Sequence, residues 1–148
     1  MNRRTEPKLI TVVIPVRNRA RLVEATLASV AAQSMAPARI VLVDNGSTDG
    51  TEEVLRRWAD KRTDTIVVSE PIPGAAAARN RGLREVESPY VMFFDSDDIM
   101  PTRHIEEVSR GLHTCNMPPL AAFGAEMHTQ SLINLSAPTR HLRRGGGG

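Results

Sequence analysis

The sequence predicts an α/β fold, a three-layer sandwich in which helices cover both faces of a mostly parallel β-sheet. Two observations support this class. Apolar runs rich in β-branched residues alternate repeatedly with segments of helical period, and such alternation favours right-handed crossovers between parallel strands. Aromatic residues make up only 3% of the chain, so its core must consist mainly of Val, Ile, Leu and Ala, as is typical of buried parallel strands.

The composition narrows the class of protein further. With 148 residues, of which 41% are hydrophobic and 24% charged, the chain has the size and composition of one soluble domain. A net charge of +2 is too small to indicate a nucleic-acid partner. There is no signal-peptide pattern and no apolar run long enough to cross a bilayer, and the single Cys115 excludes an intramolecular disulfide. A cytoplasmic location is therefore expected, with peripheral association at the membrane left open.

The first predicted strand, Leu9 to Ile14, is a near-continuous apolar run that Pro15 ends. Arg19 to Ser34 follows with apolar residues at helical spacing, which predicts an amphipathic helix with Arg19 on its exposed side. A proline breaks this pattern before a second strand, Arg39 to Val43.

The remaining elements continue the alternation. Turn-forming and capping residues between Asp44 and Thr51 open a second helix, which carries Trp58. Further strands are predicted at Thr65–Ser69 and Tyr90–Phe94, and further helices at about Gly74–Glu85 and from Pro101 to about Leu112.

The last part of the chain has a weaker pattern. Leu120 to Phe123 could form one more short strand, whereas no period is clear from Gln130 onward. We therefore divide the chain into an N-terminal tail (residues 1–8), one α/β domain (residues 9–128) and an irregular C-terminal tail (residues 129–148).

Three carboxylates, on Asp95, Asp97 and Asp98, follow directly on the apolar run that ends at Phe94. Like charges this close repel each other unless a cation is present, and hard oxygen ligands on a tight turn suit Mg²⁺ or Mn²⁺. The carboxyl ends of the strands in an open α/β sheet are also where ligands bind. The alternative interpretation is a solvated acidic turn that caps the next helix.

Two other loops are expected at the same edge of the sheet, because they follow the ends of the first and second strands. Arg17, in the first loop, could stack on a base or pair with phosphate, or could be an ordinary surface arginine. Asp44, which begins the second loop, could accept hydrogen bonds from a base or ribose, or could form the turn and cap the helix.

A run of small residues, GAAAARNRGL, begins at Gly74 and predicts a helix that starts near this edge. Small residues allow a helix N-terminus to approach a ligand, and its N–H groups favour phosphate. Tight packing of the helix on the sheet explains the same alanines equally well. Arg79 and Asn80 lie in this helix, where either could point into the cleft or stay on the surface.

Taken together, these stretches resemble the N-terminal half of a family 2 glycosyltransferase, whose fold is Rossmann-like and of the glycosyltransferase A type. The resemblance rests on four motifs in this order: IPVRNRA, IVLVDNGSTDGT, GAAAARNRGL and YVMFFDSDD. It extends from about Leu9 to His113 and implies a site for a nucleotide-sugar donor, with a UDP-sugar favoured, and for a divalent cation, Mn²⁺ or Mg²⁺. The chain departs from the family pattern after Leu112, so the domain is expected to be incomplete.

The resemblance also implies roles for particular residues. Pro15 and Arg17 match positions that line the base pocket, and Asp44 matches the aspartate that contacts the nucleobase. Asp95 and Asp97 match the metal-binding Asp-x-Asp motif, with Asp97 as the direct ligand and Asp95 nearer the ribose or the metal. The full set of expected donor-binding residues is Pro15, Val16, Arg17, Asp44, Arg79, Asn80, Asp95 and Ser96, with Asp97 and Asp95 as metal ligands.

Three functions are compatible with these observations. The first is metal-assisted, inverting transfer of a sugar to an unknown acceptor glycan or lipid. The second is non-catalytic binding of a nucleotide sugar, because no catalytic base is identified: Glu126 is the only carboxylate after Glu107, and no motif surrounds it. The third is a magnesium-dependent phosphatase with Asp95 as nucleophile, although such enzymes usually carry that aspartate on their first strand. An oligomer or a partner chain that supplies the acceptor half is left open.

Overall fold

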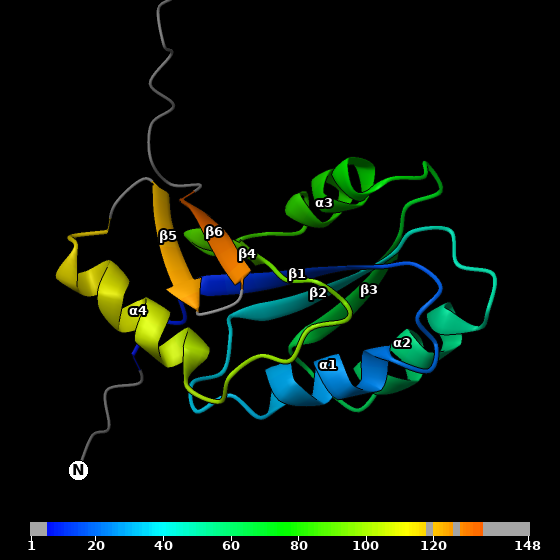
Figure 1. Cartoon of the computed structure of the whole chain (residues 1–148), viewed down its shortest axis with the longest axis horizontal. Helices are drawn as coiled ribbons and strands as arrows, with labels where there is room; N and C mark the ends of the chain where they lie inside the picture. The colour runs from blue at the N-terminus through cyan, green and yellow to red at the C-terminus, as the bar shows by residue number, and fades with distance from the viewer. Residues whose placement is uncertain (1–5, 118–119, 126–127, 135–148) are drawn as a thin grey trace, which may run out of the picture.

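The computed structural model describes residues 6–117, 120–125 and 128–134, which form a three-layer α/β domain (Figure 1). A six-stranded sheet with the order β3-β2-β1-β4-β6-β5 forms the middle layer. The elements in chain order are β1 (Ile10–Val16), α1 (Val23–Ala31), β2 (Arg39–Asp44), α2 (Thr51–Ala59), β3 (Thr65–Ser69), α3 (Ala75–Leu83), β4 (Tyr90–Phe93), α4 (His104–Thr114), β5 (Leu120–Ala125) and β6 (His128–Asn134).

The first four strands are parallel and alternate with helices, which confirms the predicted class. β1 lies at the centre, where Val12 pairs with Ile40 of β2 on one side and with Met92 of β4 on the other. The chain passes outward from β1 through β2 to β3, and then returns to add β4 on the opposite side of β1. The strand order therefore reverses between β1 and β4, and such a switch point is where an open α/β sheet forms a ligand-binding crevice.

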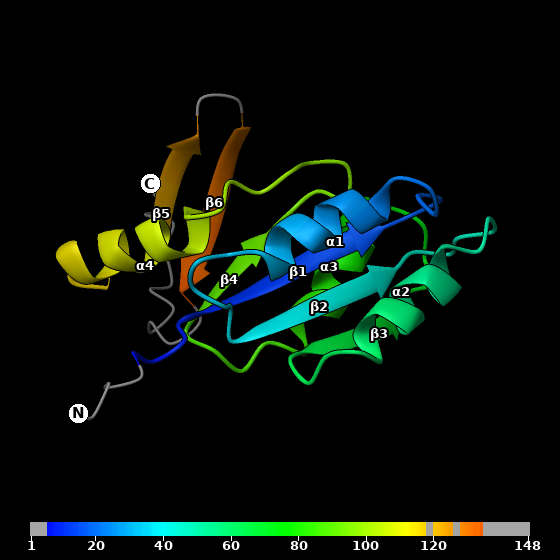
Figure 2. The ribbon, with the colours of Figure 1, turned by 90° about the horizontal axis from the view of Figure 1, so that it is seen from below.

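Alternate side chains of the strands contribute to two cores, one on each face of the sheet. Ile10, Val12 and Ile14 of β1 pack in the larger core, with residues of α1, α2 and α4. Val13 points the other way and packs with Ala78 of α3. Consistent with this division, Figures 1 and 2 show α3 alone on one face of the four parallel strands and α1 and α2 on the other.

The sequence analysis predicted that the first strand ends before Pro15. β1 instead continues through Pro15 to Val16. The reason is the neighbouring strand toward which the backbone N–H and C=O groups of each residue point. Val13 O accepts a hydrogen bond from Phe94 N beyond β4, whereas Val16 O accepts one from Asn45 N beyond β2. By this alternation Pro15 faces the β4 side, where the strand pairing has already ended at Val13, so its missing N–H removes no bond from the sheet.

The expectation of an irregular tail from residue 129 is wrong for residues 129–134. These residues belong to β6, which pairs antiparallel with both β4 and β5. The predicted short strand at Leu120–Phe123 is confirmed, as part of β5. The antiparallel pairing covers the edge of β4, which would otherwise expose unpaired backbone groups. Glu126 and residues 135–148 lie outside the described part of the chain.

Gly82 lets α3 approach the sheet closely. A Cβ atom at this position would lie 3.1 Å from Val43 Cγ2 and would collide with Val13 Cγ1. We expect Gly82→Ala to lower the free energy of unfolding by about 1–2 kcal/mol, because overpacking in the upper part of its usual range, about 2–3 kcal/mol, exceeds the roughly 1 kcal/mol gained in helix propensity. Urea unfolding measures the change, and a variant as stable as the wild type would show that α3 is not held against Val13.

Candidate functional site

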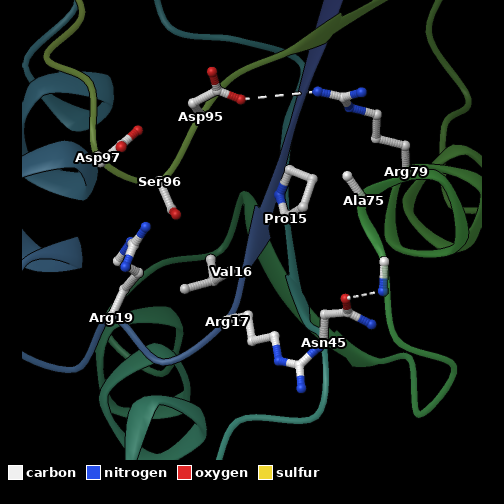
Figure 3. Close-up of a pocket in the computed structure, with 11 residues that line it drawn as sticks. Pro15, Val16, Arg17, Arg19, Asn45, Ala75, Arg79, Asp95, Ser96 and Asp97 are labelled. Atoms are coloured by element: carbon white, nitrogen blue, oxygen red, sulfur yellow. Dashed lines mark hydrogen bonds and ion pairs between the residues drawn. The ribbon is translucent and has the colours of Figure 1, made fainter.

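A pocket of about 350 Å³ lies at the carboxyl edge of the sheet, in the crevice between the ends of β1 and β4 (Figure 3). The loop after β1, the start of the loop after β2, the N-terminus of α3 and the loop after β4 all contribute to it. Its lining residues are Pro15, Val16, Arg17, Arg19, Asn45, Gly74, Ala75, Arg79, Asp95, Ser96 and Asp97.

The loops after β1 and β2 are bonded to each other. Asn18 adopts a left-handed backbone conformation, with φ of 49°, and its N–H donates to Ser47 Oγ at 3.0 Å. Its side-chain Oδ1 accepts a bond from Thr48 N at 2.8 Å. Asparagine tolerates this conformation better than most residues, so the bonded turn fixes the position of the neighbouring Arg17 backbone.

Asp49 forms a second link between the same loops. Its carboxylate accepts hydrogen bonds from Thr51 Oγ1, from Thr51 N at 3.0 Å and from Ala20 N at 3.2 Å, while Arg19 N donates to Thr51 Oγ1 at 2.9 Å. The hydrogen bond from the Thr51 side chain, with smaller contributions from the backbone bonds, holds the pKa of Asp49 below its ordinary value of 3.8.

This pKa difference predicts how the stability of the domain depends on pH. Because the pKa of Asp49 is lower in the folded than in the unfolded chain, its stabilisation is complete well above pH 3.8 and is lost as the pH falls through 3.8 toward the folded value. Asp49→Asn should therefore flatten the decrease in unfolding free energy below about pH 4. Urea titrations at pH 3 to 7 measure the unfolding free energy at each pH. If it fell with pH equally steeply in the variant and the wild type, the assignment would be contradicted.

Asp44, the last residue of β2, is buried, with 4% of its surface exposed. Its Oδ2 accepts a bond of 3.4 Å from Ser47 N, but its Oδ1 has no hydrogen-bond partner among the described residues. An unpaired buried carboxylate oxygen is costly, so such an atom marks a place where a donor from outside the chain would be stabilised. Asp44 does not itself line the pocket, although the next residue does.

Asn45, which the sequence analysis did not single out, connects the β2 end to the loop that enters α3. Its Nδ2 donates to Glu70 O at 2.9 Å and to Ile72 O at 2.8 Å, and its Oδ1 accepts from Gly74 N at 3.0 Å. Asn45 is only 5% exposed. Asn45 thus sets where α3 begins. In the sequence, an amide side chain directly after a buried strand is only a weak indication of such a role, because its hydrogen-bond partners lie on a different loop.

The N-terminus of α3 faces the pocket through Gly74 and Ala75. Gly74 has a φ of 119°, a conformation that favours glycine, and no side chain caps the helix. The partial positive charge at a helix N-terminus attracts anions, and phosphate in particular. This end of the pocket therefore suits a phosphate group.

The acidic residues after β4 form one compact turn, in which Asp98 N donates to Asp95 O at 3.3 Å. One carboxylate oxygen from each of Asp95, Asp97 and Asp98 lies within 4.8 Å of the others. Arg79 reaches toward the turn from α3: its guanidinium lies 3.9 Å from Asp95 Oδ1 and 5.9 Å from the centre of the Phe93 ring. Figure 3 shows Arg79 and Asp97 on opposite sides of Asp95.

Most residues predicted for the site do meet at the pocket: Pro15, Val16, Arg17, Arg79, Asp95, Ser96 and Asp97. Asn80 does not line it and is exposed on α3. Arg19 lines it, although we expected this residue on the exposed side of a helix. The difference arises because α1 begins only at Val23, so Arg19 lies in the preceding turn, where its carbonyl accepts from Leu22 N and Val23 N.

A Rossmann-like domain with an acidic turn and a helix N-terminus at its switch point has the architecture of a nucleotide-binding protein. The sequence profile of Glycosyl transferase family 2 matches residues 11–114. The chain belongs to this family, whose members transfer sugars from nucleotide-sugar donors.

Individual relatives agree with this assignment. The chain is 38% identical over 92 residues, 61% of its length, to the putative teichuronic acid biosynthesis glycosyltransferase TuaG of Bacillus subtilis. It is 35% identical over 103 residues, 68% of its length, to a validoxylamine A glucosyltransferase of Streptomyces hygroscopicus. These matches cover 36% and 23% of the two relatives, so the chain corresponds to a minor part of their length.

Solved structures show the same fold. The mannosyltransferase PcManGT of Pyrobaculum calidifontis, in complex with GDP-Man and Mn²⁺, has a TM-score of 0.65 at 32% identity and matches 76% of this chain and 34% of that one. TarS of S. aureus, in complex with UDP, has a TM-score of 0.68 over 81% of this chain and 37% of that one, at 23% identity. No helix within the described residues is both long and apolar enough to span a membrane.

Proposed function

We propose that this chain binds a nucleoside-diphosphate sugar and a divalent cation in the crevice, as the donor site of a glycosyltransferase. One observation carries the proposal: Asp95 and Asp97 of the acidic turn and the N-terminus of α3 line one crevice, together with Asn45, which directly follows Asp44 and its buried, unpartnered Oδ1. An acceptor, an anion site and a carboxylate cluster in this order suit a base, a diphosphate and a metal ion.

The base end of the site is assigned to Asp44, with Pro15, Val16 and Arg17 beside it. A carboxylate oxygen accepts hydrogen bonds but cannot donate them. It therefore favours uracil and guanine, whose pairing-edge ring nitrogen carries a hydrogen, over cytosine, whose ring nitrogen N3 at that edge is an acceptor. A UDP-sugar is the favoured donor. The printed titles of similar structures name GDP-Man for the mannosyltransferase and UDP for a glucosyl-3-phosphoglycerate synthase that is 26% identical to this chain, with a TM-score of 0.55.

The chemistry of the acidic turn fits a divalent cation. Asp95, Asp97 and Asp98 offer only hard oxygen ligands, the type that Mg²⁺ and Mn²⁺ prefer, and two of the three are exposed enough to bind without a large change of structure. Asp97 and Asp95 would hold the ion. When bound, it would neutralise the negative charge that builds up on the diphosphate as the sugar leaves.

The protein's own residues supply the remaining charge and orientation. The N–H groups at the start of α3 would bind phosphate oxygens, and Asn45 keeps that helix end in place. Arg79, half exposed and 3.9 Å from Asp95, would pair with a phosphate from the side opposite Asp97. The donor would thus be held from three directions.

Transfer of the sugar, its inverting stereochemistry and the acceptor glycan or lipid are part of the proposal. A general base must come within hydrogen-bond reach of the acceptor hydroxyl. No described residue of the crevice is assigned that role, and Glu126 lies outside the described residues. The alternative is that the chain binds the donor without turnover. An oligomer or a partner chain would then supply the acceptor half, at a membrane surface or away from one.

Two measurements on the 148-residue chain separate these functions. Titration calorimetry with UDP, GDP, CDP and ADP in the presence of Mn²⁺ tests the donor site, and we expect UDP to bind most tightly, with CDP much weaker. Release of UDP from UDP-glucose and UDP-GlcNAc tests turnover. Binding without release supports the non-catalytic alternative; binding of none of the four nucleotides would overturn the donor-site proposal.

A further inference from the structure

Polar side chains of α1, and one just beyond its end, hold the loop that carries the acidic turn. Three side chains, two on α1 and one two residues after its end, bond to the backbone of residues 96–105. Thr26 Oγ1 donates to Ser96 O at 2.9 Å, Ser29 Oγ accepts from Met100 N at 2.9 Å, and Gln33 donates to Pro101 O at 2.7 Å and accepts from Ile105 N at 3.1 Å.

Of these contacts, the one from Thr26 lies at the centre of the acidic turn. Ser96 is the residue between Asp95 and Asp97, and its carbonyl belongs to the peptide group that links Ser96 to Asp97. Thr26 is 1% exposed, and its bond fixes the orientation of this peptide. The direction in which Asp97 leaves the backbone relative to Asp95 depends on that orientation.

A threonine at this position has no other evident purpose. Thr26 lies on the buried side of α1, next to the apolar Val23, Leu27 and Val30, where valine would have the same shape. Threonine is a weaker helix former than alanine or leucine, and within a helix its hydroxyl usually bonds to the carbonyl three or four residues earlier. Here the hydroxyl instead bonds across to Ser96, a contact between different elements.

We propose that Thr26 is a positioning residue for the divalent cation: by holding Ser96 O, it keeps the Asp95 and Asp97 carboxylates converged on one point. The inference rests on the proposed donor site, because it assigns to Thr26 an effect on the metal that this site would bind. Groups that orient metal ligands typically contribute about 10–100-fold to metal affinity.

The test is Thr26→Val, which removes the hydroxyl and keeps the shape of the side chain. Mn²⁺ binding to the full chain, followed by the electron paramagnetic resonance of free Mn²⁺, should weaken about tenfold, while UDP binding without metal stays unchanged. In the absence of metal, the amide hydrogens of residues 96–98 should exchange faster in Thr26→Val than in the wild type. Thr26→Ser keeps the hydroxyl and should restore Mn²⁺ affinity.

Thr11→Val is the matched control. Thr11, a residue of β1 far from the acidic turn, is also 1% exposed. Its hydroxyl forms a hydrogen bond with Ser88 Oγ at 2.7 Å. Thr11→Val should lose one buried hydrogen bond, as Thr26→Val does, and should bind Mn²⁺ like the wild type. Wild-type Mn²⁺ affinity in Thr26→Val, or an equal loss in Thr11→Val, would overturn the positioning role. A wild-type chain that binds no Mn²⁺ would instead overturn the metal site itself, and the inference with it.

Discussion

Replacing Asp97 by alanine should abolish the effect of Mn²⁺ on nucleotide binding. The variant loses the carboxylate assigned as the direct ligand, and only Asp95 and Asp98 remain of the few protein carboxylates that could hold the ion. The loss in Mn²⁺ affinity should exceed the roughly 10–100-fold that changes outside the ligand set cause. UDP should then bind the variant equally with and without Mn²⁺, as calorimetric titration can measure.

Asp60→Ala is the control for this experiment. Asp60 is an exposed carboxylate at the end of α2 and does not line the crevice, so its removal changes the net charge by the same amount. We expect it to bind UDP and Mn²⁺ as the wild type does. If Asp97→Ala retained the Mn²⁺ dependence, the cation would bind elsewhere and the assignment of the acidic turn would be wrong.

The second large effect is expected at Asp44. In Asp44→Asn an amide replaces the carboxylate, and if its oxygen keeps the contact with Ser47 N, its NH₂ group takes the place of the unpartnered Oδ1. A donor then faces the N–H of uracil where an acceptor stood before. Because a hydrogen bond to a charged group contributes about 1.5–3 kcal/mol, UDP should bind about 10–100-fold more weakly.

The same substitution should spare the fold and change the preference among nucleotides. The wild type maintains an unpaired buried carboxylate oxygen, so removing its charge should leave the free energy of unfolding unchanged or raise it. The ratio of CDP to UDP affinity should rise, since cytosine presents an acceptor to the new amide. A variant that loses stability but keeps its preference for UDP would show that Asp44 serves the fold and not the base.

The sequence predicted those features that depend on local pattern. Apolar runs and helical spacing sufficed for the order of elements through α4, and turn residues after strands sufficed to place Arg17, Asp44 and Asp95 at one edge of the sheet. The parallel topology guarantees that such loops meet, so their joint position followed without any knowledge of packing.

What the sequence did not predict depends on contacts between distant segments. Pro15 can continue β1 only because its nitrogen faces the side where β4 has ended. Asn45 matters through its bonds to the loop that precedes α3, and neither loop reveals the other from local pattern. The role of Thr26 likewise depends on a carbonyl after β4. The strand after residue 128 is stabilised by pairing with β4 and β5, which no periodicity of its own indicated.

The most direct test of the proposed donor site is the titration of the 148-residue chain with UDP, once without metal and once with Mn²⁺. If the crevice holds both ligands together, Mn²⁺ should raise UDP affinity by about tenfold or more, and UDP should raise Mn²⁺ affinity by the same factor, since binding linkage is reciprocal. Absence of UDP binding in both conditions, or binding that Mn²⁺ leaves unchanged, would contradict a metal-assisted donor site in this crevice.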